Sequence, residues 1–155
     1  MNNCLPRPES LIEHRGSMLL IDELVSVADR TAHCVGYVRR DNPFLMDGHL
    51  PAWALLEYIA QAVATLAGYL RLTAGDQYLH GLLLGCRRME FEDVLPSVED
   101  RLDLHVEEIL QLDKLGNFKG CAWLAGRKIA SGVLSVYETE YWPDSVEHAA
   151  STGQA

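Results

Sequence analysis

The chain has 155 residues, of which 48% are hydrophobic and 23% charged, so it suits one globular domain and leaves little room for a second. Its formal charge of −9, with scattered Lys and Arg, excludes nucleic acid as a partner, because neutralising phosphates requires clustered basic residues. The longest apolar stretch, residues 52–72, contains Glu57, Gln61 and Arg71, so we expect no stable membrane insertion. Residues 1–9 hold no apolar run of signal-peptide length, and the expected location is cytoplasmic.

The first 40 residues predict a turn-rich entry followed by a hairpin. Short apolar runs at residues 11–13 and 18–21 flank a turn at residues 15–17. Residues 23–40 alternate between apolar and polar side chains and bend at Asp29-Arg30, a pattern typical of a hairpin or of one long bent strand.

A loop and then a helix form the middle of the chain. Residues 41–51 contain the turn pairs Asn42-Pro43, Asp47-Gly48 and Leu50-Pro51. Residues 52–70 are apolar on nearly every helical face, which predicts a helix surrounded by other protein. Pro51 suits its first turn, and the small residues at 73–75 suit its end.

Four strand-like segments follow the helix, at residues 80–89, 101–112, 118–124 and 128–137. Residues 114–117 and 125–127 between the later segments predict short hairpin turns. The predicted class is therefore α+β, with an antiparallel β-sheet wrapped around one long central helix. This order of elements resembles the hotdog fold, and we expect the protein to form a dimer. Residues 1–138 form this domain in the prediction, and residues 139–155 form a polar, flexible tail.

His49 and Glu57 are the candidate catalytic residues. Glu57 lies within an apolar helical stretch, where a carboxylate must find a partner or keep its proton. The eight positions between the two residues correspond to roughly 10 Å of helix axis, too far for both to act on one substrate atom within one chain. If they act together, the site is completed across a two-fold dimer.

The start of the helix predicts further contacts. Free backbone N–H groups near Ala54 would stabilise negative charge developing on the carbonyl oxygen of a substrate. Gln61 lies one turn after Glu57 on the same face, so its amide can orient that carboxyl group.

Three segments carry a resemblance to a known family. Residues 48–51 (GHLP) with residues 55–62 (LLEYIAQA) resemble the motif of the 3-hydroxyacyl-ACP dehydratases of fatty-acid synthesis, and residues 13–22 (EHRGSMLLID) are similar to an upstream segment of the same enzymes. Residues 81–89 (GLLLGCRRM) and the compact helix start after Pro51 look more like the ApeP-like dehydratase family of aryl-polyene gene clusters. The resemblance covers residues 11–137. The fatty-acid enzymes have extra residues between the His and the Glu, which this chain lacks.

The resemblance implies dehydration of a 3-hydroxyacyl chain carried on acyl carrier protein. His49 would remove the proton alpha to the thioester carbonyl, and protonated Glu57 would donate a proton to the departing hydroxyl, which requires a raised Glu57 pKa. We expect no cofactor, since phosphopantetheine arrives as part of the substrate. Expected partners are acyl carrier protein and a second hotdog subunit, in a homodimer or in a heterodimer with a related dehydratase.

Several other residues have two interpretations. Trp53 and Tyr58 flank the helix start and either line an acyl tunnel or close the core. Arg87 and Arg88 point in opposite directions if both lie in a strand, so at most one can face a site. Arg87 either contacts substrate or carrier protein or is a solvated charge at the edge of the sheet. The remaining histidines share no ligand spacing and are expected to be structural or exposed: His14, His33, His80, His105 and His148.

The four cysteines are 30, 52 and 35 positions apart without a C-x-x-C pair, which predicts buried free thiols and no metal site.

Two other functions remain open from the sequence. One is a hotdog thioesterase, in which Glu57 activates water and His49 is incidental. The other is a non-catalytic subunit that pairs with a related dehydratase, which the short segment between His49 and Glu57 favours.

Overall fold

The computed structural model describes residues 4–140 and contains one helix and one six-stranded antiparallel sheet. The strands lie in the order β1-β2-β4-β5-β6-β3, and two 3-10 turns, Pro8–Ser10 and Gly16–Met18, precede them in the chain. The elements are β1 (Glu23–Ala28), β2 (Thr31–Tyr37), α1 (Ala54–Ala74), β3 (His80–Phe91), β4 (Arg101–Leu112), β5 (Leu115–Leu124) and β6 (Arg127–Thr139).

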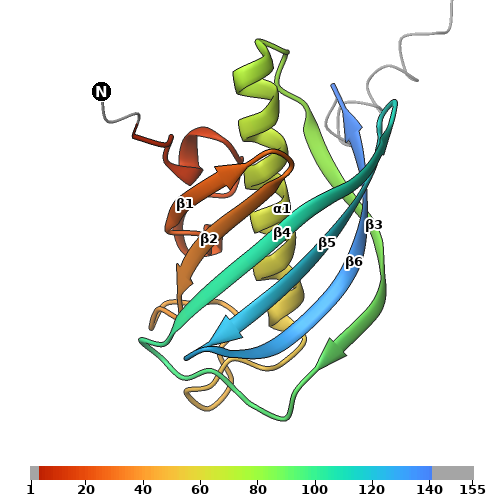
Figure 1. The fold of residues 1–155 in the computed structure, drawn as a ribbon. Helices are drawn as coiled ribbons and strands as arrows, with labels where there is room; N and C mark the ends of the chain where they lie inside the picture. The colour runs from red at the N-terminus through yellow and green to blue at the C-terminus, as the bar shows by residue number, and fades with distance from the viewer. Residues whose placement is uncertain (1–3, 141–155) are drawn as a thin grey trace, which may run out of the picture.

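The curved sheet wraps around α1, as Figure 1 shows. The core lies between them and joins one face of the helix, including Leu55, Ile59 and Leu66, to inward side chains such as Leu104 and Phe118. Inward residues recur at every second position along β4 and β5, since successive strand residues point to opposite faces. The predicted hotdog architecture is therefore confirmed.

The predicted helix end is confirmed, and its predicted start is two residues early. Gly75 adopts a left-handed conformation with φ of 72°, and its N–H caps the last turn. Pro51 lies before α1, because residues 51–53 form a tighter turn that leads into the helix.

The hairpin between residues 23 and 40 is also confirmed, with β1 and β2 paired on either side of Asp29-Arg30. The hairpin turn predicted at residues 114–117 is present but lies earlier than predicted, because the chain reverses at Asp113-Lys114 and Leu115 already lies in β5. The predicted tail lies almost entirely outside the described residues. Within the described part of the chain, no helix is long and apolar enough to span a bilayer.

β3 lies at one edge of the sheet and pairs only with β6 among the described strands. Leu83, Leu84 and Phe91 on this strand are exposed, although large apolar side chains of an isolated domain are normally covered. A strand edge also presents unpaired backbone groups that can pair with another strand. The edge of β3 is therefore open in the described part of the chain, and the predicted dimer stays a prediction.

The N-terminal segment crosses close to α1 at Gly68. A Cβ at this position would lie 2.5 Å from the backbone carbonyl oxygen of Leu11. We expect Gly68→Ala to lower the free energy of unfolding by about 1–3 kcal/mol, because the strain exceeds the gain in helix propensity. Urea unfolding checks this, with Gly81→Ala as the control, since that Cβ meets only Val136 at 3.4 Å. Equal losses in both variants would contradict the assigned contact.

The outer face of the sheet carries a stacked histidine pair. The His33 and His105 rings lie 4.4 Å apart between centroids, and His33 Nε2 is 2.7 Å from Asp103 Oδ1. Burial and then the charge of His33 lower the pKa of His105, against the opposing effect of Asp103. The folded chain therefore binds fewer protons at His105 than the unfolded chain does. His105 thus lowers the free energy of unfolding as the pH falls below the pKa of a histidine in the unfolded chain, about 6.5.

The expected result is that His105→Gln loses less unfolding free energy between pH 7 and pH 5 than the unmodified protein does. Urea unfolding across this range measures the difference, and Lys119→Gln on the neighbouring strand serves as the control. Parallel pH profiles for His105→Gln and the unmodified protein would show that the stacked pair contributes nothing to acid sensitivity.

Candidate active site

An apolar cavity of about 510 Å³ runs along one face of α1. Its floor is formed by helix residues one turn apart, its first wall by the N-terminal segment from Leu11 to Met18, and its second wall by Leu83 of β3 and Val136 of β6. The helix floor includes Glu57, Ala60, Ala64, Ala67 and Arg71. The small alanines leave room above the helix, so the cavity can hold an extended apolar ligand.

Glu57 and Gln61 meet at one end of this cavity, as the i, i+4 spacing predicts. Gln61 Nε2 donates to Glu57 Oε1 at 3.0 Å and to the carbonyl oxygen of Met18 at 2.7 Å, while Gln61 Oε1 accepts from the N–H of Leu20 at 2.8 Å. The hydrogen bond expected from the spacing is therefore present, and the orienting role of Gln61 stays a prediction. Because the Gln61 amide is buried and uses both its nitrogen and its oxygen, it ties the Glu57 carboxylate on α1 to the N-terminal segment.

His14 is the site residue that sequence reasoning missed. Its Nε2 lies 3.5 Å from Glu57 Oε1, and both side chains line the cavity. The sequence placed His14 among structural or exposed histidines, because its contact with Glu57 depends on the path of the N-terminal segment across α1. The available signal was its position in the EHRGSMLLID segment.

The pKa of Glu57 lies below its ordinary value, so the raised pKa expected from an apolar helix is wrong for this chain. Burial alone raises the pKa, but hydrogen bonds from His14 and Gln61 and the charge of His14 outweigh it. Its place in the first turn of α1 also favours the ionised form. Glu57 is thus a carboxylate held by two partners.

His49 lies apart from the cavity-lining residues, on an exposed turn before the helix. Asp47 and Gly48 have φ of 50° and 77°, and the backbone groups of Met46 and His49 bond to each other across them. This is the geometry in which Asp-Gly is favoured, so the local sequence fixes where His49 emerges. Ser97 Oγ lies 3.2 Å from His49 Nδ1 and fixes the ring.

The expected free donor at Ala54 is absent from this helix start. The N–H of Ala54 donates to Pro51 at 3.0 Å, and those of Leu55 and Leu56 donate to Ala52 and Trp53 at 3.0 and 3.2 Å. The turn before α1 therefore satisfies these groups, and Ala54 itself is fully buried. The prediction of a free backbone donor at Ala54 is wrong in the described chain.

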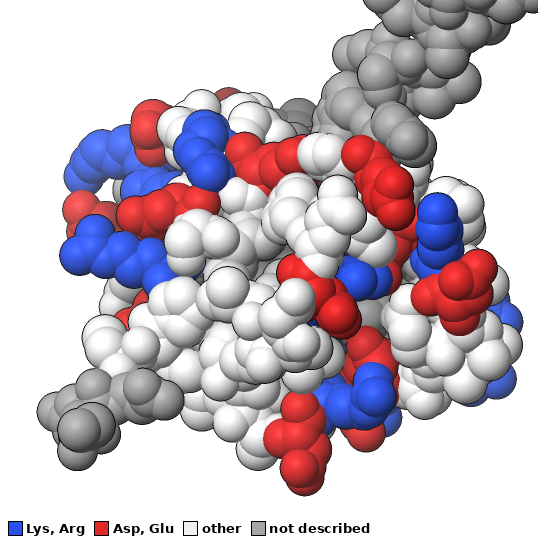
Figure 2. Space-filling view, turned by 90° about the horizontal axis from the view of Figure 1, so that it is seen from above, with Lys and Arg blue, Asp and Glu red and all other residues white. Residues whose placement is uncertain are grey.

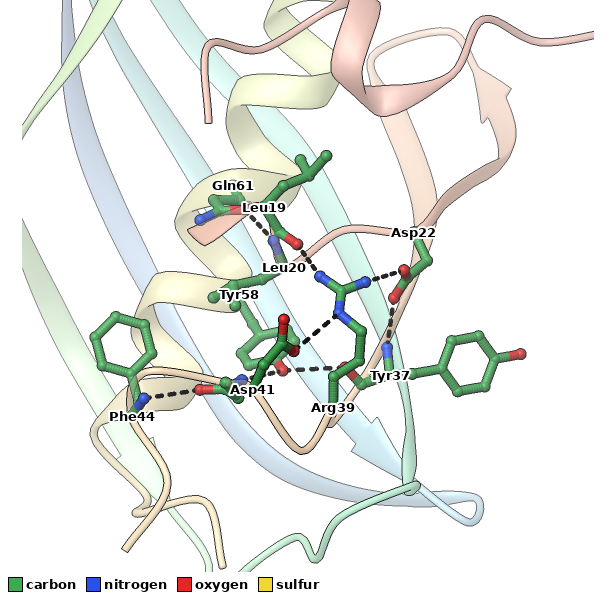
Figure 3. Close-up of polar contacts among 10 residues, drawn as sticks. Leu19, Leu20, Asp22, Tyr37, Arg39, Asp41, Phe44, Tyr58 and Gln61 are labelled. Atoms are coloured by element: carbon green, nitrogen blue, oxygen red, sulfur yellow. Dashed lines mark hydrogen bonds and ion pairs between the residues drawn. The ribbon is translucent and has the colours of Figure 1, made fainter. Parts of the chain in front are cut away.

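Tyr58 belongs to the core and does not line the cavity. Its hydroxyl accepts from Asn42 Nδ2 at 2.8 Å and donates to the carbonyl of Tyr37 at 3.3 Å, and burial raises its pKa to about 12. Figure 3 shows this cluster beside Gln61, where Arg39 contacts Asp22 and the carbonyl of Leu19. The cluster fastens the segment after His14 and the loop before His49 to α1.

Trp53 and Arg87 also lie outside the cavity. Trp53 is 56% exposed and packs edge-on against Phe44, with ring centroids 5.6 Å apart. Arg87 is exposed on β3, where its register partner Val133 places it on the outer face of the sheet. In the described chain, neither side chain reaches Glu57 from these positions.

The prediction of buried thiols is right only for Cys34, whose pKa burial raises to about 12. Cys4 and Cys86 are exposed, and Cys121 is half-buried. Among residues 4–140, no group of three or more His, Cys, Asp or Glu side chains is arranged to hold a metal ion.

Fold and site together define a hotdog domain with a carboxylate at one end of an apolar cavity. The family model described as ApeP dehydratase, ApeP-like, matches residues 6–148. The chain belongs to this ApeP-like dehydratase family. No curated protein sequence matches it significantly.

Solved structures share the fold. A chain of the dehydratase heterocomplex ApeI:P from Xenorhabdus doucetiae is 28% identical, with a TM-score of 0.83 and coverage of 94% of this chain and 98% of that chain. A hypothetical thioesterase with coenzyme A from Streptococcus pneumoniae TIGR4 is 14% identical, with a TM-score of 0.60 and coverage of 76% and 84%. The E. coli PaaI protein of the phenylacetic acid degradation operon is 13% identical, with a TM-score of 0.59 and coverage of 74% and 81%. The last two likenesses show the fold alone.

Proposed function

We propose that this chain forms part of a dehydratase that converts a 3-hydroxyacyl thioester on acyl carrier protein into the trans-2-enoyl thioester and water. The observation that carries the proposal is Glu57, oriented by Gln61, at one end of an apolar cavity large enough for an acyl chain. Membership of a dehydratase family agrees with it. The acyl chain would belong to fatty-acid-like or aryl-polyene synthesis.

The chemistry divides between two subunits. His49 of one subunit takes the α-proton at Nε2, which requires Nδ1 to carry the ring hydrogen and donate it to Ser97 Oγ, 3.2 Å away. The helix carboxylate of the facing subunit, which is Glu57 in a homodimer, gives a proton to the 3-hydroxyl, which leaves as water while the double bond forms. Glu57 must therefore be protonated when the substrate is bound, and His14, whose Nε2 lies 3.5 Å from Glu57 Oε1, is the neighbouring group placed to pass a proton to it. Substrate and partner covering the cavity add to the burial that favours a neutral Glu57.

The second subunit binds at the exposed edge of β3. Its presence extends the sheet and covers Leu83, Leu84 and Phe91. The similar structure is a dehydratase heterocomplex, which supports a related hotdog protein as the partner. Arg87 remains exposed on the outer face near this edge, where it can contact an acidic carrier protein.

A turnover assay tests the proposal. The full chain, together with any hotdog partner that co-purifies, is incubated with a 3-hydroxyacyl pantetheine thioester. Dehydration produces the conjugated enoyl thioester, which absorbs in the ultraviolet, and leaves the thioester bond intact. Free thiol with an unchanged acyl chain would instead establish the thioesterase alternative, in which Glu57 activates water.

A non-catalytic subunit is the second candidate function. Two observations favour it: His49 lies outside the cavity lining, and the pKa of Glu57 is lowered rather than raised. The discriminating experiment replaces Glu57 and His49 in this chain only and then adds the intact partner. Full turnover by that mixed complex would assign the chemistry to the partner alone, whereas loss of turnover would show that this chain contributes catalytic groups.

A further inference from the structure

A second hollow of about 500 Å³ lies at the C-terminal end of α1, beyond the apolar cavity. We call it the end hollow. It is lined by charged side chains, including Asp29, Arg30, Asp76 and Glu108, whereas the cavity is mostly apolar. Figure 2 looks onto this end of the molecule, where acidic and basic side chains alternate over the surface.

Ala67, Arg71 and Glu138 line both the cavity and the end hollow. Ala67 contributes only a methyl group, so the partition between the two spaces is made chiefly by the ion pair of Arg71 and Glu138. The pair is well covered, with side-chain exposures of 24% for Arg71 and 9% for Glu138.

The backbone holds both members of this pair in place. Arg71 lies in the last turn of α1, and Glu138 lies near the end of β6, where its N–H donates to the carbonyl of Lys114 at 2.8 Å. Gln111 Nε2 lies 3.4 Å from Glu138 Oε2 and adds a further contact. Separating the pair would leave two buried charges without compensation, so an alkyl chain cannot push it aside cheaply.

The partition also contains a polar group, and an alkyl chain cannot form a hydrogen bond with it. Arg71 Nε is buried and finds no hydrogen-bond partner among residues 4–140. Glu57 and Arg71 lie fourteen residues apart on α1, about 21 Å along its axis, so the cavity has a fixed length between its carboxylate and its ion pair.

We propose that the Arg71–Glu138 ion pair is the end wall of the acyl cavity and sets the longest acyl chain that the site accepts. This inference rests on the proposed function, since it requires the cavity to hold the acyl chain. Removing both side chains joins the cavity to the end hollow, and longer chains can then pass beyond Arg71 into a space open to solvent.

The test uses non-cleavable 3-hydroxyalkyl pantetheine thioethers of increasing chain length, in which CH2 replaces the thioester carbonyl. Affinity is measured by calorimetry on the full chain together with any co-purifying partner. The variant is Arg71→Ala with Glu138→Ala, which removes both charges at once and so avoids an uncompensated buried carboxylate. Arg71→Met with Glu138→Leu keeps most of the volume without the charge. Asp76→Ala, in the end hollow alone, is the matched control.

In the unmodified protein we expect affinity to rise with chain length and then to drop sharply. The double alanine variant should bind chains beyond this limit at least tenfold more tightly than the unmodified protein, with shorter chains changed less than twofold. The Met and Leu variant and Asp76→Ala should keep the original limit.

An unchanged limit in the double alanine variant, with binding intact and a folded protein by thermal unfolding, would overturn the end wall and leave the proposed function standing. Failure of every thioether to bind the unmodified protein would overturn both, because the cavity would then not be an acyl site.

Discussion

Glu57→Gln is expected to reduce formation of the enoyl thioester by about 10²–10⁴-fold, the range for loss of a general acid or base. Glutamine has nearly the same shape, so the variant should fold and keep a contact with Gln61. It cannot exchange a proton with the substrate or with His14, which lies 3.5 Å from the carboxylate in the unmodified protein. Turnover of a 3-hydroxyacyl thioester at saturating concentration is the measurement.

Glu13→Gln is the matched control, because Glu13 is a second carboxylate in the lining of the same cavity. We expect it to keep turnover within about a factor of three, since a catalytic contribution would be far larger. If Glu57→Gln retained more than about a tenth of the normal rate, Glu57 would not be the acid.

The stability of Glu57→Gln should depend on pH less steeply than that of the unmodified protein. The pKa of Glu57 is lowered in the folded chain, so its ionised form stabilises the fold above the unfolded pKa of about 4.5. That contribution disappears as the pH falls through the folded pKa. Glu57→Gln should therefore show a flatter loss of unfolding free energy below pH 5 than the unmodified protein.

Leu84→Asp is expected to prevent assembly of the dimer and, with it, turnover. Leu84 lies on edge strand β3 and is 60% exposed, so a partner strand would cover it. Burying an unpaired carboxylate there should weaken association by about 3 kcal/mol or more, which exceeds a hundredfold in Kd. Sedimentation velocity measures the assembly, and enoyl formation measures its consequence.

Leu112→Asp is the control for this change, because Leu112 is also 60% exposed on a strand but lies at the end of β4, away from β3 in the sheet order. Assembly and turnover should remain normal in this variant. A Leu84→Asp protein that assembles and turns over normally would show that the subunits meet at another surface.

The sequence predicted the fold well because its elements are long and periodic. The apolar stretch of α1 and the alternation along β4 and β6 are local signals, and Gly75 marks the helix end by its left-handed backbone. Errors were confined to boundaries. One example is the tight reversal at Asp113-Lys114, which the sequence alone placed later in the chain.

The site was predicted where it depends on neighbours along the helix. Glu57 and Gln61 are one turn apart, so their contact follows from spacing. His14 was missed because it reaches Glu57 only through the crossing at Gly68 and the bonds of Gln61 to Met18 and Leu20. The direction of the Glu57 pKa was wrong for the same reason, since the apolar helix alone predicts a rise.

Other errors concern the start of the helix. Ala54 was expected to offer a free N–H, but the turn after Pro51 already accepts that hydrogen bond. Tyr58 was left open between tunnel and core, and only the distant Asn42 and Tyr37 decide for the core. Such contacts join segments that no local pattern connects.

The distance between His49 Nε2 and the nearest helix carboxylate in the assembled protein tests the central claim most directly. A crystal structure of the complete assembly gives this distance. We expect His49 to lie within about 8 Å of Glu57, or of the partner's carboxylate at the same helix position, so that one substrate lies between base and acid. A separation beyond about 8 Å from every such carboxylate would contradict the shared acid–base site.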